Sequence, residues 1–425
     1  MSNVLDELAW RGMLQDATEG ASEHLAGGAR TCYIGFDPSA ASLHVGSLLP
    51  VMALVHLQRG GHHPIAVVGG GTGLIGDPSG KAAERRLLGA EEAFANAEGI
   101  RAQLEHFLDF SARSNPARLR NNYDWLGVLP MVDFLRDTGK HFSVNAMLRK
   151  ESVRRRLEDE ESGISYTEFS YLLLQAYDFL ELRRREGCTV QLGGSDQWGN
   201  ITAGIDLIRR VFGDQAYGVT LPLVTTSAGV KFGKTEAGAV WLDARLTSPF
   251  GFYQFWLNTD DKDALRYLRF FTLLGSQEIA AHAESLERNP ERREAQRALA
   301  ADVTRRVHGE SGLQRARLAT EALFGGELEG LAAGDVEEIF AEVPSSQVSR
   351  SALEGEGKPL VELLVESGLV PSRGEARRAI EGGGIYLNGR RVTETQARAT
   401  LDDALEGRFL VLRKGKRSHH LVRVD

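Results

Sequence analysis

The hydrophobic positions of the chain fall into short runs that alternate with longer amphipathic stretches. Residues 31–36 (TCYIGF) and 64–69 (PIAVVG) are mostly apolar, and a helical pattern over roughly 44–59 separates them. A third apolar run, 188–192, precedes a helical pattern over about 195–211. Strands that alternate with helices in this way predict an α/β fold, with a parallel sheet covered by helices on both faces.

The pattern changes after residue 248. Residues 249–342 are rich in Ala, Leu, Arg and Glu and lack a strand pattern, which predicts an α-helical domain. Residues 343–357 (VPSSQVSRSALEGEG) are small and polar, which predicts a flexible linker. Residues 358–425 combine a capped helix with a hairpin turn at Asn388–Gly389, which predicts a small α+β domain. Residues 1–220 then form the α/β domain, and 221–248 form an irregular connector.

Composition narrows the class of protein. The 425 residues are 42% hydrophobic and 25% charged, as in ordinary soluble globular proteins. Cys32 and Cys188 are too few for a disulfide framework or a thiolate zinc site, and both lie in apolar runs. We expect buried thiols, no structural metal, no membrane-spanning segment and a cytoplasmic location.

The net charge of −8 is unevenly distributed. Residues 357–425 contain 13 Lys and Arg against 9 Asp and Glu, a net charge of +4, so the remaining residues carry −12. A basic terminal domain on an acidic body favours a polyanionic partner at that end of the chain. A merely solvated terminal domain is the alternative.

Two short segments carry the most specific chemistry. Residues 42–47 (SLHVGS) and 231–235 (KFGKT) each place hydrogen-bond donors and positive charge on a glycine-containing frame. Such groups stabilise the negative charge that builds up on a triphosphate during transfer. Either segment alone is more often a helix entrance or a solvated loop. Together, in an α/β chain, they predict ATP chemistry.

A glycine-rich loop after the second predicted strand offers a competing interpretation. Gly71, Gly73 and Gly76 match G-x-G-x-x-G, a pattern of dinucleotide-binding proteins. Asp77–Pro78 follows at once, so the loop does not open into a helix, and no suitable acidic residue ends the next strand. The context therefore disfavours a dinucleotide site.

A helix predicted over 167–182 is apolar around most of its surface, which indicates burial. Tyr171, Gln175 and Asp178 nonetheless recur at helical spacing on one face. Polar groups on a buried helix must line a polar pocket or pair internally, although a solvated face is the alternative. A phenol, an amide and a carboxylate would suit a small zwitterion with a second polar end.

Four motifs stand in order along the chain: residues 33–39 (YIGFDPS), 44–47 (HVGS), 193–200 (GGSDQWGN) and 231–235 (KFGKT). Together they resemble the motifs of bacterial tyrosyl-tRNA synthetases, which are class I aminoacyl-tRNA synthetases. The resemblance covers nearly the whole chain. It implies a Rossmann-like parallel-sheet catalytic domain, an α-helical anticodon-binding domain, and a C-terminal RNA-binding domain like that of a small-subunit ribosomal protein.

The resemblance also implies a reaction. L-tyrosine and ATP, with Mg²⁺, give tyrosyl-adenylate and pyrophosphate, and tyrosine then passes to the acceptor end of tRNA(Tyr). A homodimer through the catalytic domains is implied, with the apolar stretch around 125–142 as its contact surface. A tryptophanyl-type synthetase or a non-catalytic RNA-binding or splicing protein could use the same scaffold. The intact ATP motifs disfavour the last of these.

The resemblance assigns site residues in groups. The residues implied to stabilise the departure of pyrophosphate are Ser39, His44, Lys231, Lys234 and Thr235. Those implied to bind tyrosine are Tyr33 and Asp178 at the phenol hydroxyl, with Asp77, Tyr171 and Gln175 at the α-amino group. Those implied to bind ATP or the adenylate are Gly35, Asp37, Gly46, Ser47, Gly194, Asp196 and Gln197. Further pyrophosphate contacts are implied for Lys81 and Arg85.

Two positions depart from the family pattern. The motif at 44–47 ends in Ser47, where related enzymes usually carry His or Asn, so a shorter side chain would have to contact ATP. Pro50 falls inside the helix that follows, and it should kink that helix because proline cannot donate a backbone hydrogen bond.

Overall fold

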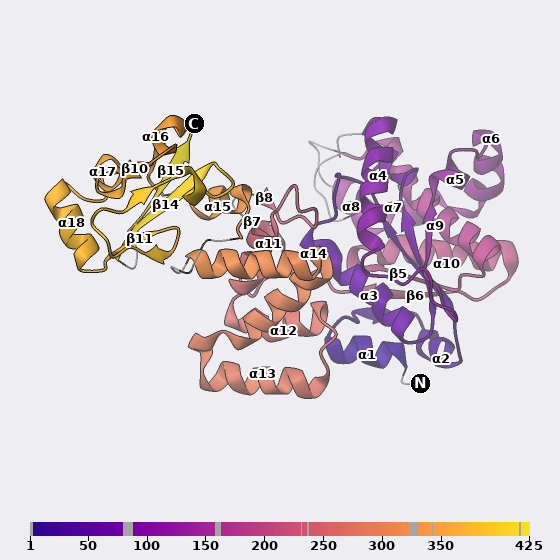
Figure 1. The fold of residues 1–425 in the computed structure, drawn as a ribbon. Helices are drawn as coiled ribbons and strands as arrows, with labels where there is room; N and C mark the ends of the chain where they lie inside the picture. Colours follow the sequence, from indigo (N-terminus) through magenta and orange to yellow (C-terminus); the bar gives the residue numbers. More distant parts are fainter. Residues whose placement is uncertain are drawn as a thin grey trace. The chain divides into compact units, whose positions relative to one another are not determined.

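The computed structural model forms two compact units (Figure 1). The first contains Met1–Thr247 and Trp256–Val307, and the second contains Ser248–Phe255 and His308–Asp425. The residues that the structure describes are 3–79, 88–157, 163–230, 232–235, 238–323, 326, 328, 330–341, 343–415 and 418–425.

A six-stranded sheet forms the centre of the first unit, in the order β1-β6-β5-β2-β3-β4. Strand β1 pairs antiparallel with β6, and all other neighbours are parallel. The strands are β1 (Asp16–Ala17), β2 (Thr31–Phe36), β3 (His63–Val68), β4 (Arg118–Asn121), β5 (Val190–Gly194) and β6 (Tyr217–Leu221). The predicted parallel α/β sheet is therefore confirmed.

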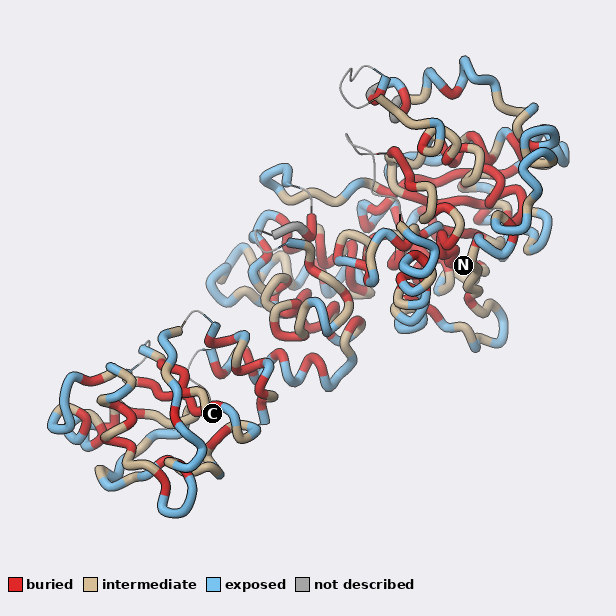
Figure 2. Tube along the Cα trace, turned by 90° about the horizontal axis from the view of Figure 1, so that it is seen from above, coloured by how far each residue is buried: buried red, intermediate tan, exposed pale blue. Residues whose placement is uncertain are grey.

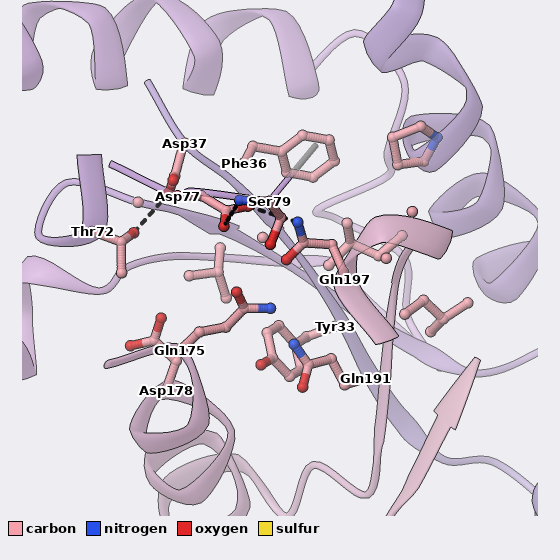
Figure 3. Close-up of a pocket in the computed structure, with 18 of the residues that line it drawn as sticks. Tyr33, Phe36, Asp37, Thr72, Asp77, Ser79, Gln175, Asp178, Gln191 and Gln197 are labelled. Atoms are coloured by element: carbon pink, nitrogen blue, oxygen red, sulfur yellow. Dashed lines mark hydrogen bonds between the residues drawn. The ribbon is translucent and has the colours of Figure 1, made fainter. Parts of the chain in front are cut away.

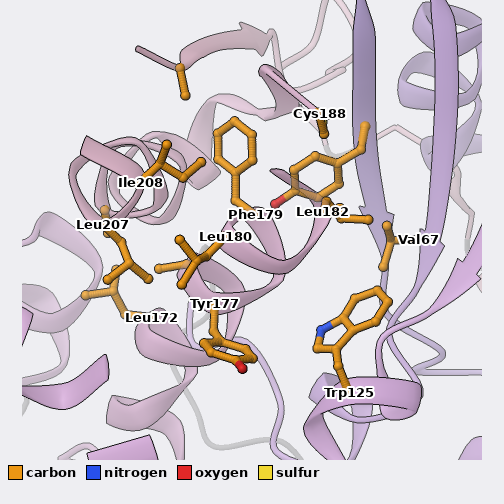
Figure 4. Close-up of a cluster of buried hydrophobic side chains, with 14 of the residues drawn as sticks. Val67, Trp125, Leu172, Tyr177, Phe179, Leu180, Leu182, Cys188, Leu207 and Ile208 are labelled. Carbon is orange, nitrogen blue, oxygen red and sulfur yellow. The ribbon is translucent and has the colours of Figure 1, made fainter. Parts of the chain in front are cut away.

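Helices cover both faces of this sheet. Successive strand residues point to opposite faces, and the neighbours Tyr33 and Ile34 are both 2% exposed. Tyr33 and Val67 share one hydrophobic cluster with Phe179 and Leu207 from two helices (Figure 4). Most residues of β2, β3, β5 and β6 are buried, and Figure 2 colours the trace of the chain by burial.

The helices that precede the connector, residues 221–248, belong to the same unit as this sheet. Helix α3 contacts β2, β3 and β5, and α10 contacts β5 and β6. Their bounds are α1 (Val4–Arg11), α2 (Ala21–Ala26), α3 (Leu48–Arg59), α4 (Ala90–Leu104), α5 (Tyr123–Leu126), α6 (Met131–Asp133), α7 (Val144–Leu148), α8 (Glu151–Leu157), α9 (Tyr166–Glu186) and α10 (Trp198–Phe212).

The expected kink at Pro50 is wrong. Helix α3 begins at Leu48, so Pro50 is its third residue, and the helix continues to Arg59. The first backbone N–H groups of an α-helix have no acceptor within the helix. Proline therefore removes no helical hydrogen bond at this position.

Helix α9, which carries the polar stripe of the sequence, is fixed at its start by a buried ion pair. The Ser165 hydroxyl accepts a hydrogen bond from the Glu168 N–H at 3.2 Å and caps the helix. The Glu168 carboxylate pairs with Arg156 of α8 at 2.9 Å, and the two side chains are 1% and 2% exposed. Arg156 Nε also donates to the Gly163 carbonyl at 2.8 Å. Arg156 thus ties α8 and Gly163 to the first turn of α9.

The connector includes a small hairpin of β7 (Lys234–Thr235) and β8 (Gly238–Ala239). The helices predicted over 249–342 follow, and they are shared between the two units. Helices α12 (Asp261–Phe271) and α13 (Ser276–Arg288) belong to the first, and α15 (Ala333–Ile339) to the second. Helices α11 (Pro249–Leu257) and α14 (Glu294–Leu323) contribute residues to both.

The second unit contains a five-stranded sheet in the order β12-β11-β14-β15-β9. A two-stranded sheet pairs β10 with β13. The strands are β9 (Ser345–Val348), β10 (Lys358–Pro359), β11 (Ile385–Leu387), β12 (Arg390–Arg391), β13 (Arg398–Ala399), β14 (Phe409–Lys414) and β15 (Ser418–Val424). The helices that complete it are α16 (Arg350–Leu353), α17 (Leu360–Glu366) and α18 (Arg373–Glu381).

The expectation of a flexible linker over 343–357 is wrong for most of its length. Strand β9 pairs in parallel with β15, and α16 follows it. Val348 and Leu353 from this segment are 5% and 0% exposed in the hydrophobic core of the unit. The small polar residues that suggested a linker therefore form an edge strand. By contrast, the predicted hairpin turn at Asn388–Gly389 joins β11 to β12, with φ of 49° and 81°.

No helix in the described part of the chain is both long and apolar enough to cross a membrane.

The Glu168–Arg156 pair predicts a large effect on stability. Glu168→Ala leaves a buried, unpaired guanidinium, so we expect the free energy of unfolding to fall by about 3–5 kcal/mol, measured by urea denaturation. Glu98→Ala is the matched control, because the Glu98–Arg101 pair is exposed and such pairs contribute at most about 1 kcal/mol. Equal shifts of the two urea midpoints would contradict a structural role for the buried pair.

Candidate active site

A cavity of about 320 Å³ opens at the carboxyl ends of β2, β3 and β5. Strand order reverses here, since β2 is followed along the chain by β3 on one side and has β5 on the other. Crevices at such a reversal are where open parallel sheets bind ligands. The cavity therefore lies at the expected position of a ligand site in such a sheet.

The closed end of the cavity is formed by Tyr33 of β2 and Asp178 of α9 (Figure 3). Both side chains are buried, at 2% and 4% exposed. The Asp178 carboxylate accepts hydrogen bonds from Asn122 Nδ2 at 2.9 Å and Trp125 Nε1 at 2.7 Å. The Tyr33 hydroxyl has no hydrogen-bond partner among the described residues. A buried hydroxyl left unpaired is costly, so this atom is suited to a polar group of a ligand.

Burial controls the charge at this end of the cavity. It raises the pKa of Asp178 to about 7, although the hydrogen bonds from Asn122 and Trp125 favour the charged form and lower it. Burial, with the nearby Asp178 carboxylate, also raises the pKa of Tyr33 well above its usual value. The phenol thus stays neutral near neutral pH, while the carboxylate titrates there.

A chain of hydrogen bonds connects this end to the rest of the cavity wall. Asn122 Nδ2, which donates to Asp178, also lies 2.8 Å from Thr72 Oγ1. The Thr72 hydroxyl donates to Asp37 Oδ1 at 2.7 Å, and the Tyr171 hydroxyl donates to Asp37 Oδ2 at 2.8 Å. Figure 3 marks the Thr72–Asp37 bond. Four elements far apart in sequence are therefore held in one arrangement.

A second network of hydrogen bonds, made largely by side-chain amides, holds another part of the cavity wall. Gln197 Nε2 donates to Asp77 Oδ2 at 2.7 Å, and the Ser79 N–H donates to Asp77 Oδ1 at 2.9 Å (Figure 3). Asn200 Nδ2 donates to Gln175 Oε1 at 2.9 Å and to Gln197 Oε1 at 3.0 Å. These bonds join the turn after β5 to α9 and to the loop after β3.

The wall of the cavity is acidic. Asp37, Asp77, Asp178 and Asp196 line it, and none of the described lining residues is Lys, Arg or His. Such a wall favours an ammonium group and hydroxyls over phosphates. Cations that meet a triphosphate must therefore come from segments at its edge.

One edge of the cavity is formed by the segments 42–47 and 231–235. The second of these segments is called the lysine loop below. Val45 N–H donates to the Val240 carbonyl, and Leu242 N–H donates to the Leu43 carbonyl, both at 2.9 Å. Gly233 has φ of 81°, and a Cβ there would lie 2.6 Å from Val45 Cγ2. The turn at His44 and the described part of the lysine loop thus lie side by side.

The predicted site residues divide into two sets. All those assigned to tyrosine and all those assigned to ATP or the adenylate line the cavity, as does Ser39. His44 is exposed, does not line the cavity, and accepts the Gly46 N–H at Nδ1 at 3.0 Å. Lys231, Lys81 and Arg85 lie outside the described residues. For Lys234 and Thr235 only the backbone, in β7, is described.

The glycine-rich loop at 69–76 packs closely against the residues that follow β2. A Cβ at Gly69 would lie 2.1 Å from Asp37 Oδ1, and a Cβ at Gly73 would lie 2.8 Å from Pro38 Cδ. The glycines let this loop approach Asp37 and Pro38 closely. The described residues 75–79 contain no helix, in line with the poor dinucleotide context.

Sequence reasoning missed several residues of the site. Asn122, Thr72 and Trp125 complete the hydrogen bonds at the closed end, and buried Gln191 lines it on β5. Asn122 follows β4, whose residues RLRN show no apolar pattern, so that strand was not predicted. A glutamine within the buried run 188–192 was a signal that could have been read.

The raised pKa of Asp178 predicts a titration that Trp125 reports, because its indole N–H donates to this carboxylate. Tryptophan fluorescence should change with a midpoint near pH 7, the pKa to which burial raises Asp178. Asn122→Ala removes a hydrogen bond to the charged form, so the midpoint should move to higher pH. Trp125→Phe should abolish the signal. An unchanged midpoint in Asn122→Ala would contradict the assignment.

Comparisons with known proteins identify the family of the chain. Residues 26–325 match the family model of class I tRNA synthetases for tryptophan and tyrosine. Residues 335–422 match the C-terminal domain of tyrosine–tRNA ligases of the SYY-like type.

Known relatives match this chain along nearly its whole length. The chain is 56% identical over 424 residues to Tyrosine--tRNA ligase of Roseiflexus castenholzii, covering 100% of both chains. It is 52% identical to that of Bacillus caldotenax, covering 99% of both. A truncated Aspergillus nidulans mitochondrial tyrosyl-tRNA synthetase superposes with a TM-score of 0.69 and 30% identity, covering 76% of this chain and 95% of that one. The chain therefore belongs to the tyrosine–tRNA ligases, class I aminoacyl-tRNA synthetases that use ATP to join tyrosine to its tRNA.

Proposed function

We propose that the cavity binds tyrosine by its two polar ends, with the phenol hydroxyl between Tyr33 and Asp178. The observation that carries this proposal is the buried Tyr33 hydroxyl without a partner among the described residues, at the same end of the cavity as Asp178. Ionised Asp178 would accept the phenol proton in a hydrogen bond. Phenylalanine would leave both groups buried and unpaired.

The α-ammonium group of tyrosine binds at Asp77, Tyr171 and Gln175. The Tyr171 hydroxyl donates to Asp37, so its oxygen is able to accept a hydrogen bond from the ammonium. Asp77 supplies a negative charge, and Gln197 and the Ser79 N–H hold its carboxylate in place. The acidic wall supports this orientation.

ATP lies along the remaining wall, with Mg²⁺ as part of the substrate. A Cβ at Gly35 would meet no atom of the described residues within 4 Å beyond its chain neighbours, which leaves room for the nucleotide. Asp196 supplies a carboxylate suited to ribose hydroxyls. Asp37 is a further contact of the adenylate. The other adenylate contacts in this proposal are Gly46, Ser47, Gly194 and Gln197.

The pyrophosphate leaves at the edge formed by the motif segments. In this proposal Ser39, His44 and the lysine loop stabilise its charge. The residues involved from the loop are Lys231, Lys234 and Thr235, with Lys81 and Arg85 as further contacts.

Activation of tyrosine needs no catalytic base. The substrate carboxylate is already ionised, so it can attack the α-phosphorus of ATP directly, and pyrophosphate departs. The enzyme contributes positioning and charge stabilisation. A terminal ribose hydroxyl of tRNA(Tyr) then attacks the acyl group, and AMP leaves. The basic residues of 357–425 and the helices of 249–342 would hold the tRNA.

The test of this arrangement is discrimination between substrates. ATP–pyrophosphate exchange with tyrosine, phenylalanine and tryptophan should favour tyrosine in the wild type. Tyr33→Phe should lower kcat/KM for tyrosine roughly tenfold or more, because the substrate hydroxyl loses a partner and an unpaired buried group costs about 1–3 kcal/mol. The value for phenylalanine should change little. Tyr123→Phe, at a tyrosine that is 39% exposed, is the matched control. Equal losses for both amino acids in Tyr33→Phe would refute phenol recognition by Tyr33.

We also propose that the enzyme is a homodimer. Large apolar side chains are exposed in and around α6 and α7, including Val128 at 75%, Met131 at 73%, Val132 at 68% and Val144 at 58%. Clusters of this kind on a soluble protein mark an interaction surface, and a second copy of the chain offers the same apolar patch.

A cytoplasmic location is proposed as well, because reducing conditions would suit the free, buried thiols of Cys32 and Cys188.

The dimer has its own test. Met131→Asp and Val132→Asp together should convert the dimer to a monomer, because they place charges in the apolar contact, and light scattering would show the mass halved. Val211→Asp changes an apolar residue of 38% exposure on α10 and should leave the dimer intact. A monomeric wild-type chain, or a dimeric double variant, would rule out this interface.

A further inference from the structure

Helix α4 lies against the loop that leads from β2 to His44. Asn96, Gly99 and Gln103 follow one face of this helix. Asn96 Nδ2 donates to the Pro38 carbonyl at 3.2 Å, and a Cβ at Gly99 would lie only 2.5 Å from the Ala41 carbonyl oxygen. The absence of a side chain at Gly99 therefore permits direct contact between helix and loop.

Ser42, the first residue of the segment 42–47, is the centre of this contact. Its side chain is buried, at 4% exposed, and its hydroxyl donates to the Leu43 carbonyl at 2.7 Å. The same oxygen accepts hydrogen bonds from Gln103 Nε2 at 2.8 Å and from the Asp243 N–H at 3.2 Å. One donor and two acceptor sites are the full capacity of a hydroxyl, and all are used.

Gln103 completes the arrangement from α4. Its Oε1 accepts the Leu43 N–H at 2.8 Å, so both polar ends of its side chain hold the Ser42–Leu43 segment. Asp243 belongs to the chain that returns from the lysine loop, where Leu242 N–H donates to the Leu43 carbonyl. Ser42 thus joins three segments: α4, the loop before His44, and the chain after the lysine loop.

We propose that Ser42 and Gln103 are positioning residues for tyrosine activation, which set His44 relative to the cavity. This proposal rests on the proposed function, in which His44 helps to stabilise the departing pyrophosphate. Neither Ser42 nor Gln103 lines the cavity, whereas Ser39, Gly46 and Ser47 on either side of Ser42 do. A shift of the Ser42–Leu43 segment would therefore move groups at the reacting phosphates without touching the tyrosine end.

The experiment is single-turnover formation of tyrosyl-adenylate by the full-length chain. Ser42→Ala and Gln103→Ala should each slow this step by roughly 10- to 100-fold, the range expected when groups at the reaction are slightly misplaced. The dissociation constant of tyrosine should stay unchanged. A variant that destabilises the fold in general would change both. Gln103 is only half-buried, so its variant provides the test if Ser42→Ala does not fold.

Gln58→Ala is the matched control, because Gln58 holds another loop in the same manner. Its amide donates to the Asp109 and Asn115 carbonyls at 2.6 and 3.1 Å, and its Oε1 accepts the Asp109 N–H at 3.0 Å. This loop is not part of the cavity wall. Gln58→Ala should therefore leave the rate of adenylate formation as it is in the wild type. An equal loss of rate would overturn the proposal.

A double-mutant cycle with His44→Ala separates positioning from folding. If Ser42 acts through His44, Ser42→Ala should have much less effect in the His44→Ala background than in the wild type. An unchanged fold-loss in that background, or a wild-type rate for Ser42→Ala alone, would overturn the inference and leave the proposed function standing. A wild-type rate for His44→Ala would contradict the role proposed for His44 itself, and with it its positioning by Ser42.

Discussion

The burial of one carboxylate, Asp178, constrains the structure around the active site. Removing a carboxylate from water costs several kcal/mol unless hydrogen bonds compensate, and this side chain is 4% exposed. Asn122 and Trp125 supply those bonds, and they come from the chain just after β4 and from α5. The short edge strand and the short helix that follows it must therefore be placed accurately.

A second constraint is the separation of charge within one site. The substrates bring an ammonium group and a triphosphate to neighbouring positions, and a single cavity lining cannot favour both. The described lining carries carboxylates and no basic side chain, while the motif segments with His44 and the lysine loop lie at an edge. The hydrogen-bond chain through Thr72 and Asp37 keeps the acidic side chains apart at fixed positions. In the proposed function, binding of tyrosine and stabilisation of pyrophosphate are therefore carried out by different elements.

Local patterns in the sequence were sufficient for some of the elements that carry the site, although not for β4. Strands β2 and β3 are short apolar runs, helix α9 is apolar over most of its surface, and the stripe of Tyr171, Gln175 and Asp178 does line the cavity. Local patterns failed where a partner distant in sequence decides the structure. The polar segment 343–357 becomes strand β9 only because β15 pairs with it. Pro50 was misjudged because the exact start of α3, which decides its effect, is not visible in the pattern.

The segment 42–47 shows why residue types can be predicted more readily than their geometry. Its residues are contiguous, so the motif is recognisable from sequence alone. Its conformation depends on Gln103, which is 60 residues away from Leu43, and on Asp243, which is 201 residues away from Ser42. Neither partner belongs to a motif: Gln103 contributes a side-chain amide, and Asp243 contributes a backbone N–H, a group that every residue except proline has. A sequence motif therefore identifies the groups that act on the substrate, and contacts outside the motif determine where those groups stand.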